Sequence, residues 1–335
     1  MKAVVIRETG GTEKLLLEEV PIPKVGCGEV LIRLHYAAMN RRDIFVRMGL
    51  YPGVKFPSIP GADGAGEVVS VGEGVKGLGK GSNVLINPAL NWGDNPRFTG
   101  KEFSILGVPT DGTHAQYVKV PAENVVKKPA FLSWEEGAAL PLAGLTAYRA
   151  LFTRGALREG ETVVIPGIGG GVATFLLQMA VAVGAKVYVT SSDEKKIEQA
   201  VKLGAKGGVN YRTPDWGKEL KEMTGGVDIS IDTIGGDTFN QLIHLARPGS
   251  RIVTFGATTG PVPNLIMPIV FLKQLDILGT TMGTPEEFQG LIDFYEKHSI
   301  HPIVDTIFPL EQIQVAHHYM EQGNQFGKIV LKIPQ

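Results

Sequence analysis

The chain of 335 residues is 43% hydrophobic and 20% charged, with a formal net charge of −1. This length exceeds what one hydrophobic core usually supports, so it predicts two domains. The near-zero charge favours neither a nucleic acid nor an anionic membrane as a partner. There is no secretory signal and no apolar run near the ~20 residues of a membrane span, so we expect a cytoplasmic protein. The single cysteine, Cys27, excludes an intramolecular disulfide and a cysteine-cluster metal site.

Short β-branched runs bounded by Gly or Pro predict that the first third is rich in strands. These runs are Lys2–Ile6, Glu29–Ala37, Gly66–Val71, Asn83–Asn87 and Ala115–Lys119. The polar segment Pro88–Pro109 is predicted to be a long loop, and loops of about 20 residues are usually functional or inherited.

From Trp134 onward, strands and helices are predicted to alternate, which favours a parallel sheet with helices on both faces. The predicted helices are Trp134–Ala139, Leu142–Phe152, Gly171–Val183, Asp193–Leu203, Asp215–Met223, Phe239–Leu245 and Pro285–Lys297. The predicted strands are Glu161–Ile165, Lys186–Thr190, Gly208–Asn210, Val227–Thr233, Arg251–Phe255 and Asp276–Thr280. The fold class is therefore α/β, with a doubly wound domain.

The C-terminal stretch returns to a strand–helix–strand pattern. Its runs are Pro302–Phe308, Leu310–Gln322 and Lys328–Lys332. We assign them to the N-terminal domain, so that residues 129–298 form a cofactor domain inserted between residues 1–128 and 299–335. The active site is expected in the cleft between the two domains.

The segment Val163–Ala173 has the sequence VVIPGIGGGVA and predicts a strand, a glycine-rich turn and the start of a helix. Such a turn lets the backbone approach a pyrophosphate, which the free N–H groups of the helix then bind. A glycine-rich string alone would equally fit a plain tight turn, but the flanking βαβ alternation favours dinucleotide binding. The residues assigned to the cofactor are Gly167, Gly169, Gly170, Gly171, Val172 and Ala173.

The residues after the second strand, Lys186–Thr190, favour NADPH over NADH. An NAD-preferring domain places a carboxylate there for the ribose 2′-OH, whereas this chain has hydroxyls that tolerate a 2′-phosphate. Asp193 remains an alternative ribose ligand, and the serines and lysines would equally serve as helix caps and a solvated face. The residues assigned to the phosphate are Ser191, Ser192, Lys196 and Tyr211.

Further segments agree in order and spacing with one known family. They are Ala38–Asp43, Gly49–Pro52, Pro60–Val68, Ala139–Tyr148, Asn210–Arg212 and Gly327–Leu331. With the glycine-rich turn they cover essentially the whole chain, which resembles the medium-chain dehydrogenase/reductase superfamily. The nearest branch resembles the zinc-free quinone oxidoreductases, the zeta-crystallin-like enzymes. The resemblance implies a GroES-like β-rich catalytic domain and a Rossmann cofactor domain.

The resemblance also implies that no catalytic zinc is bound. The positions that match the zinc ligands of the superfamily's alcohol dehydrogenases are Asn40, Ala62–Asp63 and Leu142. Asn, Ala and Leu do not replace thiolate and imidazole, and one carboxylate is not a site. The segment Asn87–Gly107, which matches the structural zinc lobe, has no cysteine, and we expect Trp92, Pro96 and Phe98 to pack it instead.

By the same resemblance, Asn40 lies near the nicotinamide and Tyr51 at the mouth of the substrate cleft. Asn40 would donate to the substrate oxygen or to the carboxamide, or would only satisfy a turn. Tyr51 would donate its O–H, stack on a planar acceptor, or stand at the rim without a role. Arg42 would bind substrate or cofactor phosphate, or pair with Asp43. Further cofactor contacts are assigned to Gly256, Thr258 and Lys328.

Three functions are compatible with these residues. The favoured one is hydride transfer from NADPH to a small quinone or α,β-unsaturated carbonyl substrate. The others are a metal-free alcohol or carbonyl dehydrogenase and a protein that binds NADPH without turnover. The resemblance also implies a homodimer in which the edge strand Asp276–Thr280 pairs with its twin.

Overall fold

The computed structural model describes all residues from Met1 to Gln335, and the chain forms two compact units. The β-rich unit comprises Met1–Leu145 and Gly283–Gln335, and the parallel-sheet unit comprises Thr146–Met282. The sequence prediction placed these boundaries after residues 128 and 298. The first boundary falls later because helix α2 (Trp134–Ala139) packs on strands β3, β4 and β17 of the β-rich unit.

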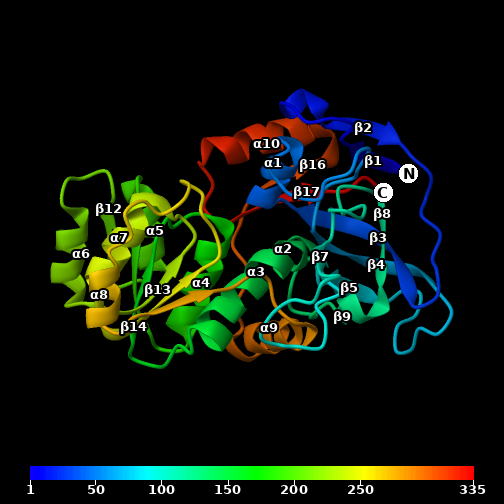
Figure 1. Cartoon of the computed structure of the whole chain (residues 1–335). Coiled ribbons are helices and arrows are strands. Elements are labelled where there is room, and N and C mark those ends of the chain that lie inside the picture. Colours follow the sequence, from blue (N-terminus) through cyan, green and yellow to red (C-terminus); the bar gives the residue numbers. More distant parts are fainter. The chain divides into compact units, whose positions relative to one another are not determined.

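A seven-stranded sheet organises the β-rich unit (Figure 1). Its strands are β3 (Glu29–Ala38), β4 (Asp63–Val71), β5 (Asn83–Ile86), β8 (Tyr117–Pro121), β9 (Val125–Lys127), β16 (Val304–Pro309) and β17 (Lys328–Lys332). The long strand β3 pairs with β4 along one edge; along the other it pairs with β8 first and then with β17. Thus the end of β3, at Ala38, lies between the starts of β4 and β17.

The remaining elements of the β-rich unit lie outside this sheet, and α2 and α10 pack on it. They are the hairpin β1 (Lys2–Val5) and β2 (Leu16–Glu19), the short pair β6 (Ala89–Leu90) and β7 (Ser104–Ile105), and the helices α1 (Arg41–Arg47), α2, α9 (Pro285–His298) and α10 (Ile313–Gln322). Three 3-10 turns lie at Thr12–Lys14, Ala122–Asn124 and Leu310–Gln312. Alternate residues of β3, such as Ile32 and Leu34, are buried together with Ile313 and Met320 of α10. The sheet and helix α10 therefore share one core.

The cysteine-free lobe between residues 87 and 107 is held by an aromatic pair. Trp92 is buried, its ring packs edge-on against Phe103 at 5.5 Å, and its Nε1 donates to the Asn95 carbonyl at 3.0 Å. Asn124 Nδ2 donates to the carbonyls of Asn87 and Ala89. Phe98 is 61% exposed, so its expected packing role was wrong and Phe103 takes it.

The parallel-sheet unit confirms the doubly wound α/β prediction. Its six strands lie in the order β12-β11-β10-β13-β14-β15, and every neighbouring pair is parallel. The strands are β10 (Thr162–Ile165), β11 (Lys186–Ser191), β12 (Gly207–Asn210), β13 (Val227–Asp232), β14 (Ala246–Thr254) and β15 (Asp276–Gly279). The order reverses between β10 and β13, and ligands of such sheets bind at the carboxyl ends of the strands beside this reversal.

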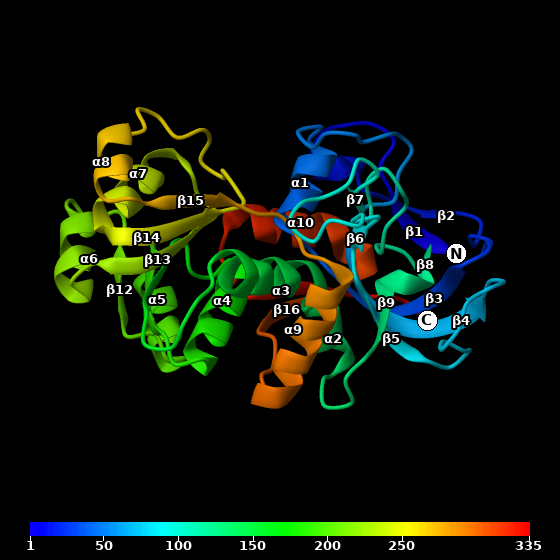
Figure 2. The same cartoon turned by 60° about the horizontal axis from the view of Figure 1, so that its bottom comes forward.

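Helices cover both faces of that sheet. They are α4 (Gly171–Ala182), α5 (Glu194–Lys202), α6 (Trp216–Thr224), α7 (Gly236–Leu245) and α8 (Met267–Leu272). Figure 2 shows α4 and α5 on one face and α7 and α8 on the other, and α6 packs on α7. The predicted helix Leu142–Phe152 is α3 (Pro141–Tyr148) continued by a π-helical turn, Arg149–Arg154. No helix of the chain has the length and apolarity that crossing a bilayer requires.

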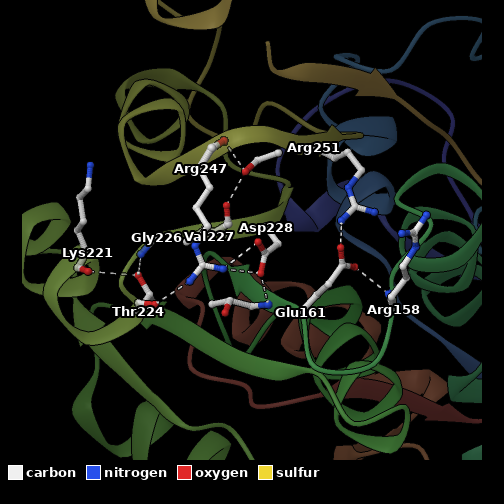
Figure 3. Close-up of polar contacts among 11 residues, drawn as sticks. Arg158, Glu161, Lys221, Thr224, Gly226, Val227, Asp228, Arg247 and Arg251 are labelled. Atoms are coloured by element: carbon white, nitrogen blue, oxygen red, sulfur yellow. Dashed lines mark hydrogen bonds and ion pairs between the residues drawn. The ribbon is translucent and has the colours of Figure 1, made fainter. Parts of the chain in front are cut away.

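A polar network fastens the amino ends of three strands (Figure 3). The carboxylate of Asp228 accepts from the backbone N–H of Thr162 and from Arg247, all at 2.8 Å. Arg251 pairs with Glu161, the residue before β10. These contacts join β10, β13 and β14 at the edge opposite to their carboxyl ends, where the glycine-rich turn follows β10.

Candidate active site

The glycine-rich turn adopts a conformation that requires glycine. Gly167 and Gly169 have φ angles of 70° and 111°, in the left-handed region that other residues rarely adopt. A Cβ at Gly167 would lie 2.9 Å from Cδ1 of Ile234. The Ile168 N–H donates to the Thr190 carbonyl at 2.8 Å and so fixes the turn against β11.

Helix α4 begins directly after this turn, with Gly170 as its N-cap. No side chain caps it, so the N–H groups of Gly171, Val172 and Ala173 have no acceptor inside the helix. Free N–H groups and the helix dipole together form an anion-binding end. Ala173 is buried against the sheet, as its small size permits. The turn and helix therefore have the geometry that a pyrophosphate needs.

Asp193 is the N-cap of helix α5. From the sequence alone, Ser191 and Ser192 were the alternative caps. Its side chain accepts from the Lys195 N–H at 2.9 Å, and the Ser191 Oγ accepts from the Asp193 N–H at 3.1 Å. One oxygen of the carboxylate that could compete for a ribose hydroxyl is thus engaged at the helix start. Lys196 lies in the first turn of α5 and Tyr211 is exposed after β12, with its N–H bonded to the Ser191 carbonyl. Ser191 itself is only 4% exposed, which leaves Ser192 as the more accessible hydroxyl.

In the same unit, the loops that follow β13 and β14 contact each other. Thr258 donates its hydroxyl to the Thr233 carbonyl at 3.0 Å, and a Cβ at Gly256 would approach the same carbonyl to 3.0 Å. Asp232, which the sequence analysis did not single out, ends β13 and accepts from the N–H groups of Ile234 and Gly235. Burial raises the pKa of Asp232, and these donors oppose the rise.

In the β-rich unit, Asn40, Asp63 and Lys328 form a closed ring of hydrogen bonds, which we call the Lys328 triad. Lys328 Nζ donates to Asn40 Oδ1 at 2.7 Å and to Asp63 Oδ2 at 2.9 Å. Asn40 Nδ2 donates to the same Asp63 oxygen at 2.9 Å. A third bond from Lys328 goes to the Met39 carbonyl at 2.8 Å, and the Leu142 N–H donates to Asp63 Oδ1 at 2.7 Å.

The strand pairing explains why these residues meet. Asn40 follows β3, Asp63 starts β4 and Lys328 starts β17, and Ala38 of β3 pairs with Asp63 on one side and with Val330 on the other. Asp63 is completely buried. Burial raises its pKa, and the Lys328 charge and the donors on its oxygens oppose the rise.

The residues at and around the triad do not fit a catalytic zinc. The three positions matched to zinc ligands are Asn40, Ala62 and Leu142, and they offer one amide oxygen, a methyl group and an apolar side chain. That amide oxygen and the neighbouring carboxylate of Asp63 both face an ammonium group, which repels a second cation. The chain also has no group of three His, Cys, Asp or Glu side chains with metal-binding geometry.

Arg42 and Tyr51 of the same unit contact each other. The Arg42 guanidinium stacks on the Tyr51 ring, 4.7 Å from its centre, and donates from Nη1 to the Leu106 carbonyl at 2.8 Å. Arg42 is buried, and its Nε and Nη2 have no hydrogen-bond partner in the protein. Asp43 is also buried and accepts from the Asn40 N–H at 2.8 Å; burial raises its pKa and the Arg42 charge opposes the rise.

Two histidines are buried in the same unit, and neither was assigned a role from the sequence. His114 and His317 have no exposed surface, and their ring nitrogens have no partner in the protein. Burial lowers the pKa of His114 to about 3; nearby Asp63 opposes this effect, whereas Arg42 and Lys328 add to it. Burial likewise lowers the pKa of His317. Both rings are therefore neutral and are not proton donors near neutral pH.

The chain combines a doubly wound unit, in which a glycine-rich turn precedes a helix, with a β-rich unit that has a buried polar centre. This combination is typical of the dehydrogenase/reductase class. Comparisons with known proteins agree with this class. Residues 26–130 match the alcohol dehydrogenase GroES-like domain and residues 171–297 match the zinc-binding dehydrogenase family. The chain belongs to the medium-chain dehydrogenase/reductase superfamily and is an oxidoreductase.

Individual relatives cover the whole chain. A zinc-type alcohol dehydrogenase-like protein from Schizosaccharomyces pombe is 39% identical over 99% of both chains. An acryloyl-coenzyme A reductase from Sulfurisphaera tokodaii is 30% identical over 99% of this chain and 100% of that protein. Among solved structures, an NAD-dependent alcohol dehydrogenase superposes with a TM-score of 0.95, at 38% identity and 100% coverage of both chains.

Replacement of His114 by glutamine, which does not titrate, is predicted to weaken the pH dependence of stability. The folded state holds His114 neutral because its pKa is about 3, whereas the unfolded chain protonates it below its ordinary value of 6.5. The wild type therefore loses stability as pH falls through this window. Urea unfolding at pH 7.5 and 5.5 should show that the wild type loses about 1 kcal/mol more than His114→Gln.

The wild type is compared with the variant because the raised pKa values of Asp43 and Asp63 have the opposite effect on stability. They stabilise the folded state as pH falls. His244→Gln, at an exposed position in α7, controls for the change of residue type. An equal loss of stability in wild type and His114→Gln would contradict the prediction.

Proposed function

We propose that this protein is an NADPH-dependent oxidoreductase that transfers hydride to a quinone or an α,β-unsaturated carbonyl compound without a metal, as in the zinc-free quinone oxidoreductase branch. The observation that carries the proposal is the Lys328 triad. An ammonium group, bonded to Asn40 and Asp63, lies among the residues that correspond to a metal centre.

The chemistry of the acceptor follows from this arrangement. A metal polarises an isolated carbonyl or alkoxide directly, and without it unactivated alcohols are poorer substrates. In a conjugated acceptor, the negative charge that develops on hydride addition spreads over several atoms. Hydrogen-bond donors such as the Asn40 amide and the Tyr51 O–H then suffice to stabilise the oxygen. The acryloyl-coenzyme A reductase relative bears the name of such a conjugated substrate.

NADPH, when bound, supplies the hydride, and the residues of the parallel-sheet unit hold it. The turn Gly167–Ala173 is suited to the pyrophosphate. Ser192, Lys196 and Tyr211 are suited to the 2′-phosphate, since Asp193 is engaged as the cap of α5. Gly256 and Thr258, at the ends of the strands, are suited to the nicotinamide.

A second candidate function is an NAD-dependent alcohol dehydrogenase. It is favoured by the solved structure of that description, which has 38% sequence identity with this chain. The two candidates differ in the acceptor and in the cofactor, so one set of assays separates them.

The proposed function predicts a specific pattern of turnover. NADPH absorbance should fall with 1,4-benzoquinone, 9,10-phenanthrenequinone or trans-2-hexenal, and simple alcohols with NADP⁺ or NAD⁺ should give no more than a trace. Treatment with a zinc chelator should leave the rate unchanged because no donor set for zinc is present. Reaction with alcohols alone, or loss of activity that zinc restores, would favour the second candidate.

The cofactor preference predicts the effect of a charge reversal. Lys196→Glu should raise the dissociation constant for NADPH about 10-fold, since a cation beside the 2′-phosphate becomes an anion, and should leave that for NADH unchanged. Isothermal titration measures both. Lys202→Glu, at an exposed position of the same helix, is the matched control. Tighter binding of NADH than of NADPH by the wild type would refute the preference.

We also propose that the protein is a homodimer. Strand β15 is the terminal strand of its sheet and pairs only with β14, so its other edge has unpaired backbone groups. Ile277 on β15 is 39% exposed, and nearby in sequence Phe271 and Leu272 are 64% and 74% exposed. Pairing of β15 with its twin would cover both the edge and these side chains.

This arrangement predicts that Ile277→Asp produces a monomer. Light scattering coupled to gel filtration should give twice the chain mass for the wild type and the chain mass for the variant. Val201→Asp, at an exposed apolar position of α5, should remain dimeric. A monomeric wild type at the same concentration would exclude the dimer.

A further inference from the structure

The Lys328 ammonium has no hydrogen left for a ligand. It carries three N–H groups, and three acceptors lie within hydrogen-bond distance: Met39 O, Asn40 Oδ1 and Asp63 Oδ2. Its side chain is 2% exposed. Lys328 is therefore not arranged to donate directly to a substrate or to the cofactor, although sequence analysis placed it among the cofactor-binding residues.

The same bonds fix the orientation of the Asn40 amide. An ammonium only donates, so the amide atom that faces Lys328 must be the oxygen. A carboxylate only accepts, so the atom that faces Asp63 must be the nitrogen. Rotating the amide by 180° would place N–H groups against the ammonium and oxygen against the carboxylate, which would lose both bonds. The chemistry of its two neighbours thus allows one orientation.

One donor of the triad remains unused. The Asn40 Nδ2 has two hydrogens; Asp63 accepts one, and no protein group accepts the other. Asn40 is also the most accessible member, since it is 7% exposed whereas Asp63 is fully buried. The second N–H of Asn40 is therefore the triad's candidate donor to a ligand oxygen.

We propose that Lys328 is a positioning residue, which locks the Asn40 amide so that its free N–H donates to the oxygen of the hydride acceptor. This role rests on the proposed function, because it assigns the acceptor oxygen of that reaction. A metal would apply its positive charge directly to the acceptor oxygen. The charge of Lys328 acts on that oxygen through the Asn40 amide. Polarisation of the amide through Oδ1 strengthens its remaining donor.

The first test is the kinetics of Lys328→Met with 9,10-phenanthrenequinone and trans-2-hexenal. We expect kcat to fall about 10- to 100-fold, since the donor is no longer held in place, and KM for NADPH to stay within about two-fold. Lys332→Met, at an exposed position of the same strand, is the matched control and should keep wild-type values. A folded Lys328→Met enzyme with wild-type kcat, or one in which only KM for NADPH rises, would overturn the proposal.

Loss of the ammonium leaves Asp63 as an unpaired buried charge, so the single variant is at risk of unfolding. The double variant Lys328→Met with Asp63→Leu removes both charges and keeps the site packed. It should fold, as shown by its melting temperature, and should show the same fall in kcat. Wild-type kcat in the folded double variant would overturn the proposal equally well.

Chemical rescue separates a positioned donor from a mere positive charge. In Lys328→Ala the missing atoms correspond to propylammonium, which should restore kcat about 10-fold or more when added at millimolar concentration. Tetramethylammonium has the same charge and no N–H group, and should not restore it. Equal rescue by the two ions, or rescue by neither, would overturn the proposal.

A measurement without turnover distinguishes failure of this inference from failure of the proposed function. With ¹⁵N-asparagine labelling, the Asn40 side-chain N–H₂ signals are assigned by their loss in Asn40→Ser. In the wild type the two protons should be well separated and rotate slowly, and in Lys328→Met they should exchange faster. If the wild type reduces none of the acceptors, the proposed function fails. Unchanged amide rotation in Lys328→Met would refute the locking role, whether or not the wild type reduces these acceptors.

Discussion

The pairing of Lys328 with Asp63 is the contact on which the β-rich unit depends. Two charges without solvent access are costly unless they meet at short range and satisfy their remaining hydrogen-bonding atoms, and the desolvation amounts to several kcal/mol per ion. Here Met39, Asn40 and Leu142 provide those partners. The contact forms only when β3 lies between β4 and β17 in the observed register, so the charges penalise any shifted pairing of these strands.

The sequence predicted the parallel-sheet unit well because its signals are local. Glycine turns, caps and apolar periodicity mark most of its strands and helices. β11 and β15 lie within one residue of their predicted bounds, whereas the short helix α8 was missed. The missed elements in the β-rich unit, β2, β6, β7, β9 and α1, have two to seven residues. Such short strands are defined by partners far along the chain, and local patterns do not encode those partners. The exposed Phe98 shows the same limit, because composition did not reveal which aromatic residue of the lobe packs on Trp92.

The candidate site was predictable in its parts but not in its assembly. Asn40, Arg42 and Tyr51 were identified by resemblance, and the structure places the last two in contact. Lys328 was identified too, yet its partner Asp63 is 265 residues away, and no local pattern indicates which residue that partner is. A signal was present in retrospect: a lysine begins the strand KIVLK, whose next three residues are all buried. A charged residue at the start of such a strand needs a buried partner of opposite sign.

A fixed organic cation in this position differs from a metal in a way that bears on the choice of substrate. A metal exchanges ligands, so it binds the reacting oxygen itself and carries much of the charge that develops there. Lys328 cannot do so, because all its hydrogens are committed to the protein. The neighbouring buried histidines do not supply a proton either, since burial holds them neutral. What the site offers is a rigid amide donor in a positive field, which stabilises an oxygen that carries only part of a charge. Conjugated acceptors meet that condition, whereas isolated alkoxides, whose charge is concentrated on one atom, do not.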